Sequence, residues 1–495
     1  MIRRFWAAAG LAIALVGTNA QAAPDLARMT GGELTAFTRA MPKGGELHNH
    51  VSGAIFAETL LTWAVEDGLC INAKTLAVTP PCQPAEDLKP ASAIKTDEIL
   101  RAAMIDSFSV RNPSFLGRSG HDQFFGSFGR FGAAGAGREG DMLAHVMDNL
   151  ARQNTFYLEA MVTPQGVASR VKGAQVGWKG GDLALQKAAN TAAGLEGLVG
   201  AAITDTDAME ARARSLMRCG APAALPGCQV TVRYLVQTSR VAPPEQTFAQ
   251  LQLGVALVAA DQRWVGLQLV APEDHPLAIT HYSPHMRMVD FLTDHGRTAK
   301  AALHAGELSR DYAPSEELRY HVAEAVRVAG ARRIGHGVDL PMETGAEALV
   351  TEMAAAGVLV EVNLSSNAAI LGVSGKAHPY AWLRQRGAPV SLSTDDAGIL
   401  RIDLSHEYAR AVDTGASYAD LKASARNAIA FSYLTGEGLW SDPGRYRRPA
   451  KACARQIGRV EPKVGACADL IAASDKAREQ WRHERLLAVF EAAAR

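Results

Sequence analysis

Two histidines separated by a single residue are the first candidates for chemistry in this sequence. His48 and His50 lie in the segment Gly45–His50, which has the character of a short buried strand. Because successive side chains of a strand point to opposite faces, both imidazoles face the same side and could bind one metal ion. An isolated H-x-H pair is more often a packed or surface feature, so this motif alone leaves both interpretations open.

Two further histidines follow short apolar runs later in the chain. His304 ends the run Ala301–Leu303, and Glu307 follows after a tight turn, so a metal ligand and a proton donor could share one strand end. His336 lies between two glycines, which allow close approach of backbone or substrate but reduce stability unless something requires them. A helix-starting loop for His304 and a packed core histidine for His336 remain alternative interpretations.

Adjacent carboxylates end another apolar run. Asp395 and Asp396 follow Val390–Thr394 directly. Neighbouring carboxylates at the mouth of a buried strand repel each other unless a cation neutralises one of them. The alternative, a solvated helix N-cap, accounts for one aspartate but not for the second. The pair therefore favours a function in cation binding or catalysis.

The elements that must position these residues alternate along the chain. Continuous apolar runs are typical of strands covered on both faces. Eight such runs are expected to be strands: 45–50, 155–163, 229–238, 264–271, 299–304, 333–337, 358–363 and 389–394. Helical segments lie between them, including 141–154, 315–329 and 344–356. This order predicts an α/β protein with a (β/α)8 TIM barrel, whose active site would lie at the carboxyl ends of the strands. An open doubly wound sheet is the structural alternative.

Two parts of the chain do not fit the regular alternation. Residues from about 51 to 141 are too many for one connection, and we expect an insertion after the first strand that covers one end of the barrel. Residues from about 434 to 495 form an expected C-terminal extension with a closing helix over 475–494. We therefore predict one barrel domain over residues 23–495.

Residues 1–22 have the features of an export signal. Arg3 and Arg4 precede an apolar run over 5–16, and Ala20–Ala22 has the small-residue spacing of a signal-peptidase site. The run is shorter than the roughly 20 residues of a membrane span. We predict a periplasmic or secreted protein without stable membrane insertion after signal removal; a retained N-terminal anchor is the alternative.

The six cysteines fall into three local pairs. An even number of cysteines in an exported chain favours disulfides. Many pairings are possible, but each local pair brackets a loop that contains proline or glycine. We expect Cys70 to pair with Cys82, Cys219 with Cys228 and Cys453 with Cys467.

Together, five segments resemble the motifs of the adenosine deaminase family and occur in that family's order between about Met41 and Tyr433. They are Met41–His50, His304–Glu307, Gly335–Gly337, Asn363–Asn367 and Ser393–Asp396. The resemblance implies one Zn²⁺ per chain, bound by His48, His50, His304 and Asp395. It also implies hydrolytic deamination of adenosine or a related adenine nucleoside to the 6-oxopurine and ammonia.

The resemblance further implies a role for each acid–base group. Glu307 would donate a proton to N1 of the purine, and His336 would orient and deprotonate the attacking water. Asp396 would hydrogen-bond N7 and help to hold that water. Addition at C6 disrupts the aromatic ring unless N1 is protonated, so Glu307 must hold a proton near neutral pH, and burial should raise its pKa.

Substrate contacts are expected from Ser52, Gly53, Ala271 and Asp396. Ser52 stands where adenosine deaminases usually have an aspartate that holds the ribose 5′-hydroxyl, so recognition of this end of the substrate should differ. Ala271 stands where a glycine usually lets the main chain approach N3. The export signal and the insertion after the first strand are similar to those of the secreted, growth-factor-type branch of the family. The segment 23–42 is, however, too short for the N-terminal dimerisation domain of that branch. No oligomeric state is therefore predicted.

The charge of the chain limits the classes of partner that we expect it to bind. The chain has 51 basic and 51 acidic residues and a formal net charge of zero, which gives no electrostatic sign of nucleic-acid or membrane-surface binding. The expected partner is a small purine nucleoside. No basic cluster beside the motifs could hold a phosphate, which favours a nucleoside over a nucleotide.

Two other functions compete with deamination. One is a different mononuclear-metal amidohydrolase, and the other is a non-catalytic nucleoside-binding or signalling protein on the same fold. Two-metal amidohydrolases commonly use a modified lysine on the fourth strand, and 264–271 contains no lysine. The H-x-E…P-C-x-x-C signature of cytidine-type deaminases is missing as well. Every position to which the resemblance assigns catalysis has the required residue type, which disfavours a non-catalytic protein.

Overall fold

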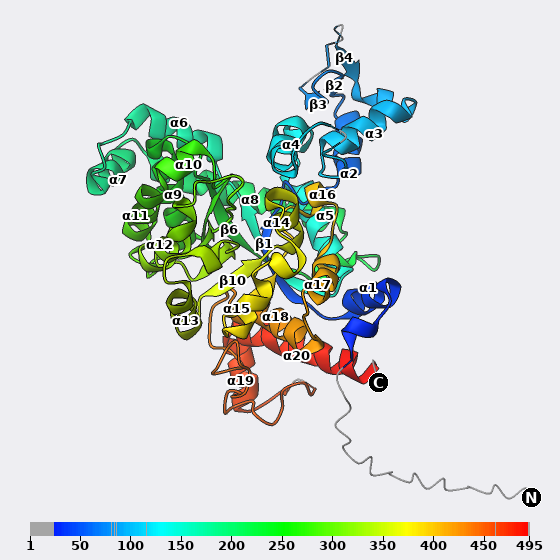
Figure 1. Ribbon diagram of the computed structural model, residues 1–495, viewed down its shortest axis with the longest axis vertical. Coiled ribbons are helices and arrows are strands. Elements are labelled where there is room, and N and C mark those ends of the chain that lie inside the picture. The colour runs from blue at the N-terminus through cyan, green and yellow to red at the C-terminus, as the bar shows by residue number, and fades with distance from the viewer. Residues whose placement is uncertain are drawn as a thin grey trace, which may run out of the picture.

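The computed structural model describes residues 24–493 except 81, 84, 86, 115 and 461 (Figure 1). The export signal expected over 1–22 lies outside these residues. None of the helices in this part of the chain is long and apolar enough to cross a membrane.

Eight parallel strands form a barrel in chain order. They are β1 (Gly44–His50), β5 (Thr155–Val162), β6 (Thr231–Ser239), β7 (Trp264–Val270), β8 (Lys300–Ala305), β9 (Arg333–His336), β10 (Leu359–Val362) and β11 (Val390–Leu392). A parallel bridge between Asn49 and Asp395 joins the last strand to the first, and the Asp395 N–H donates to the His48 carbonyl at 3.0 Å. The predicted (β/α)8 barrel is confirmed, and each strand begins and ends within two residues of its expected range.

Helices surround the strands and bury their outward-facing apolar side chains. They are α5 (Glu139–Ala151), α6 (Gly166–Val176), α7 (Leu183–Ala192), α8 (Leu198–Leu216), α9 (Pro244–Ala260), α10 (Pro276–Thr280), α11 (Tyr282–Thr293), α12 (His321–Arg327), α13 (Ala346–Ala356), α14 (Leu364–Leu371), α15 (Tyr380–Gln385), α16 (Ala397–Leu400), α17 (Leu404–Asp413) and α18 (Tyr418–Ala430), with α1 (Gly31–Ala40) before the barrel. The helix expected over 315–329 is shorter than predicted. It begins at His321 because the Glu343 side chain accepts the Val322 and Ala323 N–H groups and so caps this helix from outside.

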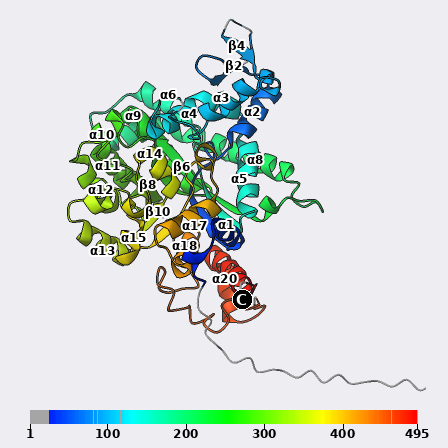
Figure 2. The same cartoon turned by 45° about the vertical axis from the view of Figure 1, so that its right-hand side comes forward.

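The connection from β1 to β5 contains the expected insertion. It comprises α2 (Ala57–Glu66), a small antiparallel sheet of β2 (Cys70–Asn72), β3 (Ala77–Thr79) and β4 (Leu88–Pro90), α3 (Glu98–Ser107) and α4 (Gly120–Gly135). In two views this insertion lies at the opposite end of the molecule from the C-terminal helix α20 (Asp475–Ala493) (Figures 1 and 2). Three phenylalanines of α4 reach the cavity at the carboxyl ends of the strands, so the insertion covers the end where barrel active sites form.

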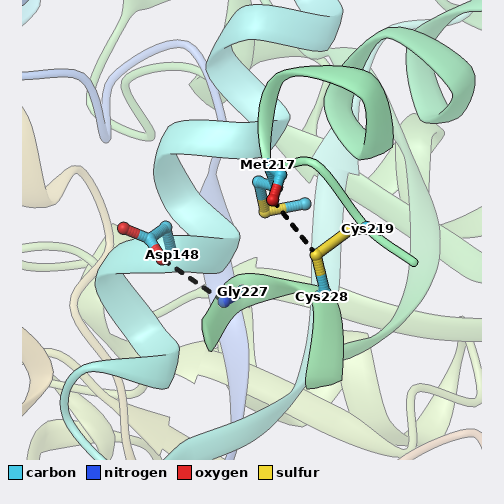
Figure 3. The surroundings of a disulfide bond; sticks show 5 residues. All are labelled: Asp148, Met217, Cys219, Gly227 and Cys228. Atoms are coloured by element: carbon cyan, nitrogen blue, oxygen red, sulfur yellow. Dashed lines mark hydrogen bonds between the residues drawn. A yellow bond between two sulfur atoms is a disulfide. The ribbon is translucent and has the colours of Figure 1, made fainter. Parts of the chain in front are cut away.

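All three expected disulfides are present, Cys70–Cys82, Cys219–Cys228 and Cys453–Cys467. Figure 3 shows how Cys219–Cys228 ties the end of α8 to the segment before β6. Beside it, the Gly227 N–H donates to Asp148 on α5 at 3.3 Å. The third disulfide holds the segment between α18 and α20, which also contains α19 (Ala466–Ala473).

Candidate metal-dependent active site

The four residues expected to bind metal meet at the carboxyl ends of β1, β8 and β11. The Nε2 atom of His304 lies 3.1 Å from His48 Nε2 and 3.3 Å from His50 Nε2. Asp395 Oδ1 lies 3.4 Å from His48 Nε2 and 3.2 Å from His50 Nε2. All four side chains are buried. These distances show that the structure brings together residues that are up to 347 positions apart in the sequence.

This donor set fits one bound cation. His48 Nδ1 lies 2.8 Å from a Glu361 carboxylate oxygen, and His50 Nδ1 lies 2.7 Å from Gln237 Oε1. Because both partners are acceptors, each Nδ1 carries the proton and each Nε2 presents a lone pair to the cluster. Lone pairs that face each other at these distances repel unless a cation lies between them. In a tetrahedral zinc site with Zn–N bonds of about 2.0–2.1 Å, neighbouring ligand atoms are about 3.3 Å apart, close to the spacing found here.

His336 and Asp396 adjoin the cluster. The ligand atoms of His48, His304, His336 and Asp395 lie within 4.8 Å of one another, and those of His50, Asp395 and Asp396 form a second such group. The two groups overlap at Asp395, as a single centre requires.

A buried charge network lies behind the candidate metal ligands and was not predicted from the sequence. Arg333 lies between Glu361 and Glu159, with nitrogen–oxygen distances of 2.7 and 2.6 Å. The guanidinium also packs 4.1 Å from the centre of the Tyr433 ring. Since Glu361 is also the partner of His48, the network fixes the orientation of that imidazole. The available signal was a glutamate within the apolar strand Leu359–Val362.

Glu307, the expected proton donor, and His336, expected to act on the attacking water, lie next to each other. Glu307 Oε1 lies 3.5 Å from His336 Nε2, and both side chains are buried. Burial raises the pKa of Glu307 well above its usual range, and the Asp395 carboxylate adds to this shift. Burial lowers the pKa of His336 to about 3. The first shift favours the protonated carboxylic acid, and the second favours the neutral imidazole.

A chain of hydrogen bonds determines which nitrogen of His336 carries the proton. The Tyr380 backbone N–H donates to His378 Nδ1 at 3.1 Å, so neutral His378 carries its proton on Nε2 and donates it to Asn367 Oδ1 at 3.0 Å. The Asn367 amide nitrogen must then face His336 Nδ1, 2.9 Å away, and donate to it. Neutral His336 therefore carries its proton on Nε2, the nitrogen on the side of Glu307.

Three of the four residues expected to bind substrate line one cavity, and the fourth does not. A cavity of about 370 Å³ opens over the candidate metal site, and Ser52, Ala271 and Asp396 line it. Gly53 is not among the lining residues; a Cβ at this position would overlap Asp396 Oδ1, so this glycine leaves room for the carboxylate. Ala271 has φ +86°, a conformation that favours glycine. Asp396 Oδ1 is buried and has no hydrogen-bond partner among the described residues.

A comparison with protein-family models shows to which family the chain belongs. Residues 141–438 match the family model described as adenosine deaminase. The chain belongs to the adenosine deaminase family. The matched range contains His304, Glu307, His336, Asp395 and Asp396, while the β1 histidines precede it.

Individual relatives of the adenosine deaminase family match shorter stretches. An adenosine deaminase from Serratia proteamaculans is 31% identical over 151 residues, which cover 29% of this chain and 42% of the relative, so the match spans less than half of that protein. Two solved structures share the fold. One is an N6-mAMP deaminase from Arabidopsis with 20% identity, a TM-score of 0.53 and coverage of 81% of this chain and 96% of the other. The other is an amidohydrolase from Burkholderia ambifaria with bound Zn, with 18% identity, a TM-score of 0.53 and coverage of 84% and 91%.

Proposed function

We propose that this protein catalyses the zinc-dependent hydrolytic deamination of adenosine or a related adenine nucleoside, in which water replaces the 6-amino group and ammonia leaves. The observation that carries the proposal is the meeting of a His₃Asp cation site and a buried carboxylic acid, Glu307, in one cavity. Membership of the adenosine deaminase family supports the same reaction.

The proposed metal is one Zn²⁺ per chain, held by His48, His50, His304 and Asp395. Three imidazoles and one carboxylate are a donor set that zinc accepts readily. When bound, Zn²⁺ supplies a nucleophile near neutral pH, because it lowers the pKa of water to about 7.

Two carboxyl groups are proposed to act on the purine ring. Burial raises the pKa of Glu307 and so favours the protonated acid, which can donate to N1 as the nucleophile adds to C6. Burial likewise raises the pKa of Asp396 well above its usual range. A protonated Asp396 can donate a hydrogen bond to N7, which is an acceptor. The main chain at Ala271 is proposed to contact N3.

His336 is proposed to orient the attacking water and to take part in its deprotonation. The Asn367 hydrogen bond favours the first part of this role, because it leaves a proton on Nε2 that can be donated to the oxygen of the water. To accept a proton at Nε2, the ring must move its own proton to Nδ1 and give up the bond from Asn367.

Export to the periplasm or the medium is proposed from the signal-like residues 1–22. The three disulfides agree with an oxidising compartment. The mature enzyme would then comprise residues 23–495, with the insertion and the C-terminal extension attached to one barrel.

The test is ammonia release from adenosine by the purified, zinc-loaded protein and by Glu307→Gln. The wild type is expected to form inosine, and the variant is expected to bind the same amount of zinc while turnover falls below detection. Equal rates in the two proteins would remove Glu307 from the mechanism. Zinc-loaded wild-type protein without turnover would favour another amidohydrolase substrate or a binding function.

A further inference from the structure

One wall of the cavity has a positive charge that deamination does not use. Among the described residues that line the cavity, Arg170 on α6 is the only lysine or arginine. It is half-buried, and it forms no ion pair or side-chain hydrogen bond with any residue that the structure describes. A partly desolvated guanidinium without a partner is suited to an anionic ligand.

The packing of α6 on α9 brings Arg170 to the cavity wall. Gly166, Arg170 and Gly173 are spaced at i, i+4 and i+7 and so lie on one face of the helix. This face packs tightly on α9, since a Cβ on Gly173 would lie only 3.0 Å from the Ala249 Cβ. From α9, Gln250 also lines the cavity; it is 3% exposed, and its Oε1 atom has no hydrogen-bond partner among the described residues. The wall therefore offers a cation and an unused polar atom on two helices that pack closely together.

The strand order shows which part of the substrate meets this wall. In the proposed function, N1 lies at Glu307 after β8, N3 at Ala271 after β7 and N7 at Asp396 after β11. N9 then points toward the remaining arc of the barrel, formed by β1, β5 and β6. Ser52 follows β1 and Arg170 follows β5, and these two strands are paired neighbours. The ribose and its 5′ substituent must therefore lie on the side of Ser52 and Arg170.

We propose that this wall is an anion-binding subsite, and that the enzyme prefers an adenine nucleoside carrying a 5′-phosphate monoester over the neutral nucleoside. This inference rests on the proposed deaminase function and specifies its substrate class. The guanidinium can donate two parallel N–H groups to phosphate oxygens. Ser52 is compatible with this ligand, whereas an aspartate at the same place would repel it. Sequence reasoning favoured nucleosides because Arg170 lies far from every motif along the chain.

The test compares kcat/KM for adenosine and adenosine 5′-monophosphate in the wild type and two charge variants. Arg170→Gln removes the proposed subsite. Lys172→Gln is the matched control, because it removes one positive charge from the same helix at a residue that does not line the cavity and instead donates to the Ala193 carbonyl. We expect the wild type to prefer the monophosphate at least about tenfold, and Arg170→Gln to reduce this preference about 10- to 100-fold, mainly through KM. Lys172→Gln should keep the wild-type preference.

A second variant and a binding measurement complete the test. Ser52→Asp should also lower the preference for the monophosphate, because it places a negative charge in the cavity that Arg170 lines. Calorimetry should show tighter binding of inosine 5′-monophosphate than of inosine, and Arg170→Gln should remove this difference. Adenosine turnover with no preference for the monophosphate, or equal losses for both substrates in Arg170→Gln, would overturn the subsite and leave the deaminase function intact. If neither substrate reacts, the deaminase proposal fails, and the calorimetric comparison still decides whether the anion subsite exists.

Discussion

Replacement of Glu361 by glutamine tests the charge network behind the metal ligands. In the wild type, one carboxylate oxygen accepts from His48 Nδ1 at 2.8 Å, and the other lies 2.7 Å from Arg333 Nε. Glutamine has the same shape but only one oxygen. Its amide nitrogen must therefore face either the His48 N–H or the Arg333 guanidinium, both of which are donors.

The magnitude follows from this mismatch. Leaving a buried donor without an acceptor costs about 1–3 kcal/mol. If the oxygen stays with Arg333, His48 loses the bond that orients its imidazole toward the cation, and zinc affinity should fall about 10- to 100-fold. If the oxygen stays with His48, the cost appears in the free energy of unfolding of the metal-free protein. The two alternatives are separated by measuring both quantities.

The assay is a competition titration of Zn²⁺ against a chelator, together with denaturant unfolding of the metal-free protein. Glu352→Gln is the matched control, because it makes the same change in an exposed pair with Arg327. Such a pair contributes about 0–1 kcal/mol, and zinc affinity should not change. The reasoning is refuted if Glu361→Gln matches the wild type in both zinc affinity and unfolding free energy.

Three other predictions follow from single features of the site. Because Ser52 is uncharged, 5′-deoxyadenosine should react with a kcat/KM within a few-fold of that for adenosine, and a far slower reaction contradicts the proposed loss of 5′-hydroxyl recognition. Because Ala271 has φ +86°, Ala271→Gly should not lower the free energy of unfolding, whereas Ala355→Gly in α13 should lower it by about 1 kcal/mol; equal losses in denaturant unfolding would contradict this. His121 on α4 lies 3.2 Å from Asp274, and although burial lowers the pKa of His121, Asp274 and Asp122 raise it overall. Because the pKa is raised, this contact stabilises the protein fully at pH below about 6.5, and the stabilisation is lost as the pH rises through the raised value. The difference in thermal stability between the wild type and His121→Gln should therefore shrink with increasing pH. A difference that does not change with pH would refute this prediction.

The barrel, and the meeting of the candidate metal ligands at one end of it, were predictable from local sequence signals. Each strand is a short apolar run, and His48, His50, His304 and Asp395 stand at or near the ends of such runs. Parallel strands in a barrel bring those ends together, so strand position predicted that these residues would meet. Their assignment to one metal ion came from the resemblance to the adenosine deaminase family. The disulfides were predictable for a similar reason, because each one closes a short loop.

The residues that were not predicted depend on contacts between distant elements. Glu361 meets His48 across the interior of the barrel, and Arg170 reaches the cavity because α6 packs on α9. His378 sets the proton position of His336 through Asn367, with no pattern in the local sequence to indicate it. The shortened helix α12 likewise depends on Glu343, whose side chain reaches it from another segment.

The central claim is that one zinc ion bound by these four ligands enables deamination, and a metal titration tests it most directly. Chelator-stripped protein is supplied with increasing Zn²⁺, and ammonia release from adenosine and from adenosine 5′-monophosphate is measured at each addition. We predict that the protein without metal releases no ammonia, that the rate of ammonia release rises linearly with added Zn²⁺, and that it saturates at one Zn²⁺ per chain. Activity in the stripped protein, saturation only at two ions per chain, or no ammonia with zinc bound would contradict the claim.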